Sequence, residues 1–257
     1  MKRRVLIIGI GAGNPDYVTI QAVNALNQVD VFFIPDKGAG KEQLSRIRRE
    51  ICERFITDPD YRMVDFETPL RHKPSSTYRA SVTDWHDKME AAYAHLLMEE
   101  LGDDECGAFL VWGDPSLYDS TIRILDRLNA KGNFELEYDV IPGITSIQAL
   151  TAKHKVVLNR IGESITITTG RKLAEGFPNN SESVVVMLDG EGAFRHIEDD
   201  VDIYWGAYLG TEDEILMSGK LRDVVDDIER LRNVARAQKG WIMDTYLLKK
   251  PFDQVEE

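Results

Sequence analysis

Residues 5–15 have the sequence Val5-Leu6-Ile7-Ile8-Gly9-Ile10-Gly11-Ala12-Gly13-Asn14-Pro15. A continuous apolar run that ends in glycine is typical of a strand buried on both faces of a parallel sheet. Glycines directly after such a strand allow backbone N–H groups to approach a ligand closely. This stretch therefore predicts an α/β fold in which the first loop is able to bind a ligand.

Strands and helices alternate through the rest of the first half of the chain. The expected strands are 31–34, 63–66, 108–112 and 134–141, and the expected helices are 19–28, 40–55, 81–101 and 117–128. This alternation predicts βαβ units and hence a mostly parallel sheet with right-handed crossovers.

The spacing of the elements changes after Pro142-Gly143. Strands are expected in quicker succession at 164–169, 183–188, 203–208 and 241–248, with helices at 144–152 and 221–232. We therefore expect two domains, residues 1–142 and 143–257, with the boundary near Pro142.

Composition restricts the class of protein. The chain has 257 residues and a formal charge of −13, and an acidic surface repels phosphate backbones, so no nucleic-acid partner is expected. No segment approaches the roughly 20 apolar residues that span a bilayer, so no membrane partner is expected.

Cys52 and Cys106 predict reduced, structural thiols of a cytoplasmic protein. Neither the cysteines nor the five histidines show metal-ligand spacing, so no metal is expected.

Two further motifs follow predicted strands. They are Trp112-Gly113-Asp114-Pro115-Ser116-Leu117-Tyr118 and Ile141-Pro142-Gly143-Ile144-Thr145-Ser146. Ligands of open α/β sheets lie outside the carboxyl ends of the strands, where Asp114 could accept hydrogen bonds from an amine or a ribose. Asp114 could equally cap a helix that begins near Pro115, and Thr145 could be an ordinary N-cap. Both interpretations remain open for each residue.

A dinucleotide site is the main alternative for the first glycine turn. Counted from Gly9, the third glycine of the G-x-G-x-x-G pattern is replaced by Asn14, and counted from Gly11 it is replaced by Asp16. That glycine allows close packing of helix on strand, so its absence weakens the hypothesis of an NAD-dependent oxidoreductase. A tight turn without any ligand also remains possible.

Taken in order, the three motifs resemble the tetrapyrrole methylase family, the class III S-adenosylmethionine-dependent methyltransferases. The family's Gly-x-Gly-Pro-Gly-Asp turn is matched by residues 9–14, its Gly-Asp-Pro loop by residues 113–115, and its Pro-Gly-x-Thr/Ser-Ser turn by residues 142–146. The likeness covers essentially the whole chain. Ala12 replaces the usual proline and Trp112 a common glycine, as in a deacetylating subgroup, which puts in doubt any contact made through those two side chains.

The resemblance implies two αβα domains, the N-terminal with a mostly parallel sheet and the C-terminal with a mixed sheet, and S-adenosylmethionine in the active-site cleft between them. It carries the cofactor contacts to Ala12, Trp112, Gly113, Asp114, Leu117, Thr145, Ser146, Met187, Leu188 and Gly210. It also implies a homodimer.

The implied reaction is that of cobalamin biosynthesis in which C-1 of precorrin-5 is methylated and the C-20 acetyl group leaves as acetate. A sister corrin methylation, a methyltransferase acting on protein or ribosomal RNA, and a non-catalytic cofactor-binding protein are the alternatives. Release of acetate needs a base that activates water, for which Asp16, Asp119 and Asp189 are candidates without any being assigned as catalytic.

A carboxylated tetrapyrrole needs a local basic group on an acidic protein. Arg160 is the preferred substrate-binding residue. Arg46, Arg48, Arg49 and Arg54 lie on one predicted helix, which we expect to be a solvated charged face, and Arg71-His72-Lys73 follow a turn.

Overall fold

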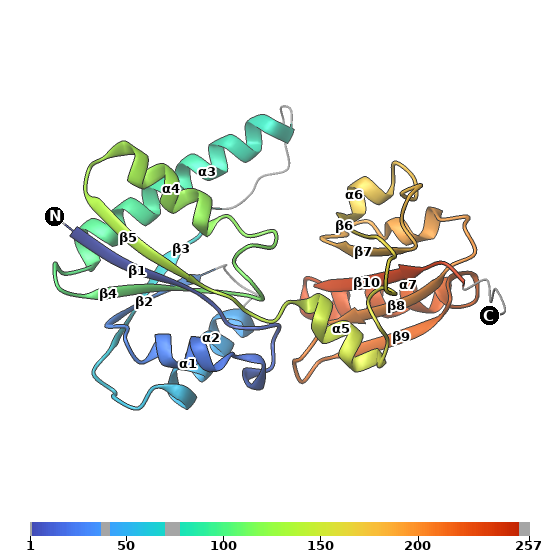
Figure 1. Ribbon diagram of the computed structural model, residues 1–257, viewed down its shortest axis with the longest axis horizontal. Coiled ribbons are helices and arrows are strands. Elements are labelled where there is room, and N and C mark those ends of the chain that lie inside the picture. Colours follow the sequence, from blue (N-terminus) through green and yellow to red (C-terminus); the bar gives the residue numbers. More distant parts are fainter. Residues whose placement is uncertain (1, 37–41, 70–77, 252–257) are drawn as a thin grey trace. The chain divides into compact units, whose positions relative to one another are not determined.

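The computed structural model describes residues 2–36, 42–69 and 78–251. The chain divides into two compact units, Met1–Thr145 and Ser146–Glu257, each with its own five-stranded sheet (Figure 1). The division falls between Thr145 and Ser146, whereas the sequence placed the boundary near Pro142. Within the described ranges, no helix has the length and apolarity needed to cross a membrane.

The first unit alternates strands with helices. Its strands are β1 (Lys2–Gly9), β2 (Val31–Asp36), β3 (Arg62–Glu67), β4 (Cys106–Val111) and β5 (Glu135–Ile141). Its helices are η1 (Pro15–Tyr17), α1 (Ile20–Leu26), α2 (Glu42–Phe55), α3 (Tyr78–His95), the π-helical turn η2 (Leu96–Glu100) and α4 (Thr121–Lys131).

All strand pairs of the first sheet are parallel, in the order β3-β2-β4-β1-β5. From β1 the chain moves toward β2 and β3, and from β4 it returns past β1 to β5. The strand order therefore reverses between β1 and β4. In open α/β sheets this reversal leaves a crevice at the carboxyl ends of the strands, where ligands bind.

Side chains of β1 alternate between two apolar cores. Val5 and Ile7 pack with residues of α3 and α4, whereas Leu6 and Ile8 pack with residues of α1 and α2. Figure 1 shows the two helix pairs on opposite faces of the sheet. A strand covered on both faces must be apolar throughout, which explains the continuous run of residues 5–8.

The second unit has a mixed sheet, in the order β6-β7-β10-β8-β9, with β6 and β7 parallel and the other pairs antiparallel. Its strands are β6 (Ile165–Thr169), β7 (Ser183–Met187), β8 (Asp202–Ala207), β9 (Ile215–Lys220) and β10 (Asp244–Lys249). Its helices are α5 (Ser146–His154), α6 (Gly170–Leu173), η3 (Ala193–His196) and α7 (Leu221–Lys239).

Buried polar groups hold the core of the second unit. Asp189 accepts hydrogen bonds from the backbone N–H groups of Gly192 and Ala193 and from the hydroxyl of Tyr246. Arg232 forms a buried ion pair with Asp244 at 2.8 Å, and Asp244 also accepts a hydrogen bond from Trp205 Nε1. These contacts compensate for the burial of the two carboxylates, because buried charges are tolerated only when they are paired or hydrogen-bonded.

Three predictions about elements were wrong. The helix expected to end at residue 232 continues to Lys239, where the left-handed Gly240 ends it. The helix expected from residue 117 begins at Thr121, because Tyr118 adopts a left-handed conformation with φ 53° that no α-helix contains. Strand β9 was missed. It pairs only with β8 and is half-exposed, so its short apolar stretch and Gly219 give a weak strand pattern.

Candidate active site

The first two glycine motifs meet through their backbones in the first unit. Gly11 and Gly113 form an isolated bridge, in which Gly113 N donates to Gly11 O at 2.9 Å. Both glycines have positive φ, 80° and 71°. The bridge joins the loop after β1 to the loop after β4, at the point where the strand order reverses.

The third motif packs against the other two so closely that side chains do not fit. A Cβ atom added to Gly9 would lie 2.6 Å from Gly143 N and 2.9 Å from Gly113 O. A Cβ atom on Gly143 would overlap the same carbonyl oxygen of Gly113. Three loops that are distant in the sequence therefore form one backbone cluster, which we call the glycine cluster (Gly9, Gly11, Gly113 and Gly143).

The side chain of Asp114 connects two loops of this cluster through hydrogen bonds. Its Oδ2 accepts a hydrogen bond from Gly143 N at 2.8 Å, and its Oδ1 accepts hydrogen bonds from the N–H and the hydroxyl of Ser116. Burial alone would raise the pKa of Asp114, but these hydrogen bonds outweigh burial and hold the pKa below its ordinary value. Asp114 is thus an ionised group that positions two loops, and it does not cap α4.

The other cofactor residues expected in the first unit lie around the glycine cluster. Ala12 is buried, whereas Trp112, Leu117 and Thr145 are half-buried. The interpretation of Thr145 as a cap agrees with its place directly before α5, which begins at Ser146. Beside Leu117, Tyr118 is exposed and left-handed, a strained conformation of the kind found at ligand-binding loops.

The path of the chain after the first glycine turn differs from a dinucleotide site. Asn14 accepts a hydrogen bond from Asp16 N and starts the 3₁₀ turn η1, and α1 begins only at Ile20 with Thr19 as its cap. A Rossmann site places the pyrophosphate on a helix that opens directly from the glycine turn. The structure therefore does not support the NAD hypothesis.

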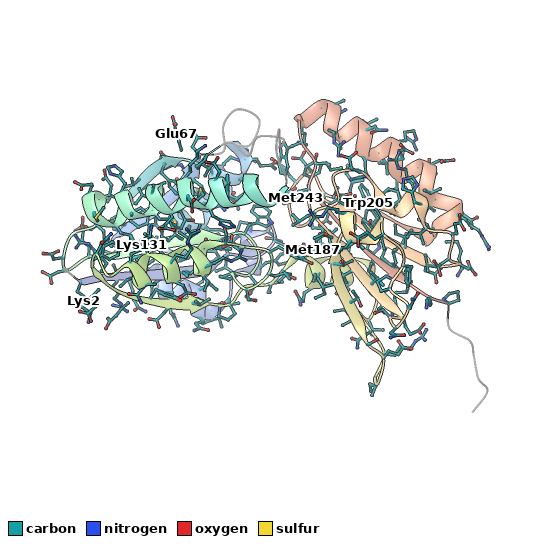
Figure 2. The ribbon with its side chains drawn as sticks, turned by 90° about the horizontal axis from the view of Figure 1, so that it is seen from above. Lys2, Glu67, Lys131, Met187, Trp205 and Met243 are labelled. Atoms are coloured by element: carbon teal, nitrogen blue, oxygen red, sulfur yellow. The ribbon has the colours of Figure 1, made fainter. Side chains whose placement is uncertain are left out.

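In the second unit, the predicted residues gather at one edge of the sheet. Met187 is the last residue of β7, and it pairs with Thr245 of β10. The hydroxyl groups of Thr245 and Ser146 share a hydrogen bond, with 3.0 Å between the two oxygens. Gly210 follows β8, and its N–H donates to Glu214 at 2.8 Å. Figure 2 shows Met187 and Met243 at the same end of this sheet, with Trp205 farther inside the unit.

Two residues at the same edge of the sheet have a strained backbone conformation. Leu188 has φ 53° and is 66% exposed, and Tyr208, directly after β8, has φ 49°. Among the described residues, three of the four non-glycine positions with positive φ are Tyr118, Leu188 and Tyr208, all within or beside predicted cofactor loops. Such strain persists where the surroundings enforce it, and it clusters at functional sites.

Tyr208 and Met243 lie at this edge beside the predicted residues, and the sequence did not single them out. Tyr208 N donates to Met243 O at 2.9 Å, and the Tyr208 hydroxyl donates to Trp241 O at 2.6 Å. The signal available was position alone, because Tyr208 lies two residues before the predicted Gly210. Met243 carries no local pattern that distinguishes it.

The three candidate bases have different surroundings. Asp189 is buried and serves the core of its unit, so it does not face a ligand. Asp16 is exposed and pairs with Arg54. Asp119 lines a pocket and accepts a hydrogen bond from Thr121 N at 2.7 Å. Of the three, Asp119 is the one that lines a described pocket.

The candidate basic residues also differ. Arg160 forms an ion pair with Glu163 at 3.0 Å, so part of its charge is neutralised. Arg46, Arg49 and Arg54 are at least partly exposed, as expected of a solvated face. Arg48 is buried at 4% exposure, so the expectation was wrong for this residue. Arg71-His72-Lys73 lie outside the described residues.

Comparisons with known proteins agree with this geometry. The family model of the tetrapyrrole (corrin/porphyrin) methylases matches residues 4–225. The chain belongs to the tetrapyrrole methylase family. It is 56% identical over 252 residues to precorrin-6A synthase [deacetylating] of Sinorhizobium sp, an alignment that covers 98% of this chain and 97% of the relative.

Solved structures show the same fold. A putative cobalamin synthesis related protein (CobF) from Corynebacterium diphtheriae superimposes with a TM-score of 0.82 at 36% identity, over 97% of this chain and 99% of that one. Uroporphyrin-III C-methyl transferase from Thermus thermophilus, solved with S-adenyl homocysteine, has a TM-score of 0.55 at 16% identity and covers 96% of this chain and 97% of its own.

Membership of the tetrapyrrole methylase family confirms the predicted fold class and the predicted methyltransferase activity. The family uses S-adenosylmethionine as methyl donor. Which residues of this chain contact that donor stays a prediction. Among the described residues, no three histidine, cysteine, aspartate or glutamate side chains are grouped as metal ligands.

Proposed function

We propose that this chain is an S-adenosylmethionine-dependent C-methyltransferase of cobalamin biosynthesis that methylates C-1 of precorrin-5 and releases acetate to give precorrin-6A. The observation that carries the proposal is 56% identity to a precorrin-6A synthase over nearly the whole of both chains. The glycine cluster supports it, because it exposes backbone groups at the reversal point of a doubly wound sheet.

The proposal assigns cofactor contacts in each unit. In the first unit they are Ala12, Trp112, Gly113, Asp114, Leu117 and Thr145, and in the second unit they are Ser146, Met187, Leu188 and Gly210. Asp114 acts by holding the loops after β4 and β5 in register, since both of its oxygens accept hydrogen bonds from loop residues. Exposed Leu188 offers an apolar surface to the nucleoside.

When bound, S-adenosylmethionine supplies a methyl group already activated by its sulfonium sulfur. The task of the protein is then to hold the acceptor carbon in line with that methyl group, and orientation of this kind can lower a barrier by roughly 7–11 kcal/mol. Preformed, strained loops suit this task, because they lose little freedom when the ligands bind.

Incubation of the purified chain with precorrin-5 and methyl-labelled S-adenosylmethionine tests the proposal. We expect one labelled methyl group in the macrocycle for each acetate released. Methyl transfer without acetate would indicate a sister corrin methylation instead. Absence of transfer to any tetrapyrrole would contradict the proposal.

Three finer points belong to the same proposal. Arg160 binds a substrate carboxylate, the chain forms a homodimer, and the enzyme is cytoplasmic. Replacement of Arg160 by Gln should raise KM for the macrocycle and leave the affinity for S-adenosylmethionine unchanged. Light scattering of the purified chain measures the oligomeric state directly.

A further inference from the structure

The first unit contains a pocket of about 310 Å³ at the carboxyl ends of β2 and β4. Six aromatic side chains contribute to its wall, Phe33, Phe66, Trp85, Tyr93, Phe109 and Trp112. Polar groups of its lining are Arg48 of α2, Asp119 before α4, and Thr121 at the start of α4. Apolar walls with a few convergent polar groups are typical of small-molecule sites.

Arg48 is the unusual member of this lining. Its Nε donates to Leu110 O at 2.9 Å and its Nη1 donates to Leu44 O at 2.7 Å, so two backbone carbonyls fix the guanidinium. Within the described part of the chain, no carboxylate forms an ion pair with Arg48 and no hydrogen bond involves its Nη2. Burial lowers the pKa of Arg48 to about 10, so the group still carries its charge at neutral pH.

Burial of a cation is costly unless other groups replace the water that solvated it, and Asp119 attracts Arg48 through space without forming a direct ion pair. The backbone carbonyls supply only partial negative charge. An anionic or strongly polar oxygen in the pocket would complete the coordination of Nη2. Arginine is well suited to this role, because its planar fork of N–H groups matches the oxygens of a carboxylate.

The groups beside Arg48 indicate which kind of ligand the pocket would accept. The carboxylate of Asp119 accepts from Thr121 N at the first turn of α4, where the positive end of the helix dipole offsets its charge. Burial raises the pKa of Tyr93, whose hydroxyl lies 3.4 Å from that of Thr121, so Tyr93 remains a neutral hydrogen-bonding group. The aromatic walls favour an alkyl part. The lining therefore matches a short alkyl chain that ends in a carboxylate.

We propose that this pocket binds an alkyl carboxylate through Arg48, with Nη2 donating to the carboxylate and the aromatic wall packing against the alkyl part. The inference rests on the proposed function, which provides two sources of this chemistry, the carboxylate side chains of the macrocycle and the acetate released in the reaction. The proposed role of Arg48 is ligand binding, which differs from the solvated charged face expected for the arginines of this helix.

Tryptophan fluorescence of the full chain tests the pocket without the macrocycle, since Trp85 and Trp112 line it. We expect a saturable change on titration with sodium acetate or sodium propionate, and none with sodium chloride at the same ionic strength. The Arg48→Lys variant keeps a cation but has one nitrogen in place of the planar fork whose Nε and Nη1 bond the two carbonyls, so its Kd for the carboxylates should rise at least tenfold.

Arg49→Lys is the matched control. Arg49 is the next residue of α2 and pairs with exposed Asp65, so its replacement should leave the Kd unchanged. An equal loss in Arg49→Lys would contradict a specific role for Arg48.

A second variant tests the pocket independently, in case Arg48→Lys does not fold. Ser120 lines the pocket at the N-cap of α4, but its side chain makes no capping hydrogen bond, so Ser120→Leu should fill the pocket and leave the helix intact. We expect an unchanged circular dichroism spectrum and loss of the carboxylate response. Native binding in Ser120→Leu, or the same saturable response to chloride in the native protein, would overturn the proposal.

Kinetics with precorrin-5 distinguishes the two sources. If the pocket holds a side-chain carboxylate of the macrocycle, Ser120→Leu raises KM at least tenfold with little change in kcat. If the pocket holds the released acetate, the same variant lowers kcat and slows acetate release while KM is kept. Unchanged KM and kcat would overturn the inference. Failure of the native chain to methylate precorrin-5 would contradict the proposed function and leave the carboxylate titration valid.

Discussion

Asp114 accepts a hydrogen bond from the backbone N–H of Gly143, which lies 29 residues later in the chain. The bond connects the loop that follows β4 to the loop that follows β5. It also orients the peptide that lies against Gly9, since Gly9 and Gly143 are in backbone contact. One carboxylate therefore determines the relative position of all three loops of the glycine cluster.

Replacement of Asp114 by Asn should lower the free energy of unfolding by about 1–3 kcal/mol, because the amide cannot accept at both of its positions. Affinity for S-adenosylmethionine should fall as well. Urea unfolding and calorimetric titration measure the two effects. Asp104→Asn is the control, since Asp104 is exposed and makes no hydrogen bond within the described ranges. Equal stability of the two variants would contradict the role of Asp114.

The pH dependence of this variant follows from the lowered pKa of Asp114. A carboxyl group whose pKa is lower in the folded state stabilises the fold above its unfolded pKa. That stabilisation is lost as pH falls through the folded pKa. The difference in unfolding free energy between native protein and Asp114→Asn should therefore be full at pH 7 and shrink as pH falls below about 4. A constant difference down to pH 2 would contradict this.

Gly143→Ala tests the close approach of the loops. The added methyl group would overlap the backbone of Gly113 and Gly9, so we expect a loss of roughly 1–3 kcal/mol in stability or displacement of the loops with loss of cofactor binding. Gly190→Ala is the control, because a Cβ atom there meets nothing within 4 Å. Its effect should stay within about 0.5 kcal/mol. A silent Gly143→Ala would show that the loops are not held this closely.

Leu188 allows backbone strain to be separated from side-chain contact. Leu188→Gly and Leu188→Ala both remove the side chain, but only glycine adopts φ 53° without steric cost. The glycine variant should be more stable than the alanine variant by about 1 kcal/mol in urea unfolding. Both should bind S-adenosylmethionine at least about tenfold more weakly, since burial of a leucine side chain contributes about 1.5–3 kcal/mol. Native affinity in both variants would remove Leu188 from the cofactor site.

Removal of one partner from the buried ion pair of Arg232 and Asp244 is expected to cost far more than removal of one partner from a surface pair. Arg232→Met leaves Asp244 buried and without its cation, which should cost about 3–5 kcal/mol. Arg230→Met, two residues earlier in α7, removes an exposed pair with Asp227 and should cost at most about 1 kcal/mol. Similar losses, measured by urea unfolding, would contradict the importance of burial.

Much of the fold follows from local patterns in the sequence. The apolar run before Gly9 predicts a strand covered on both faces, and the alternation of strands with helices predicts a parallel sheet; both are found. The steric properties of glycine and the spacing of apolar residues act over a few positions, so they are visible in the sequence. The order of the three motifs was sufficient to indicate the family.

Other features depend on groups that are distant in the sequence. Of the four arginines of α2, Arg48 shares a helix face with the buried Leu44 and Ile51, a local pattern that was not used. Its acceptor Leu110 O, however, lies 62 residues away, and only the tertiary structure reveals it. The carboxylate of Asp114 bonds to Gly143, 29 residues later, and the chain turns left-handed at Tyr118, so α4 begins only at Thr121.

The sequence by itself determined the parallel character of the first sheet and the methyltransferase activity, because short-range sterics encode the one and the family motifs indicate the other. Only the tertiary structure decided which charges are buried and which residues are strained. Burial and hydrogen bonding depend on partners that packing brings together, and no local pattern specifies those partners.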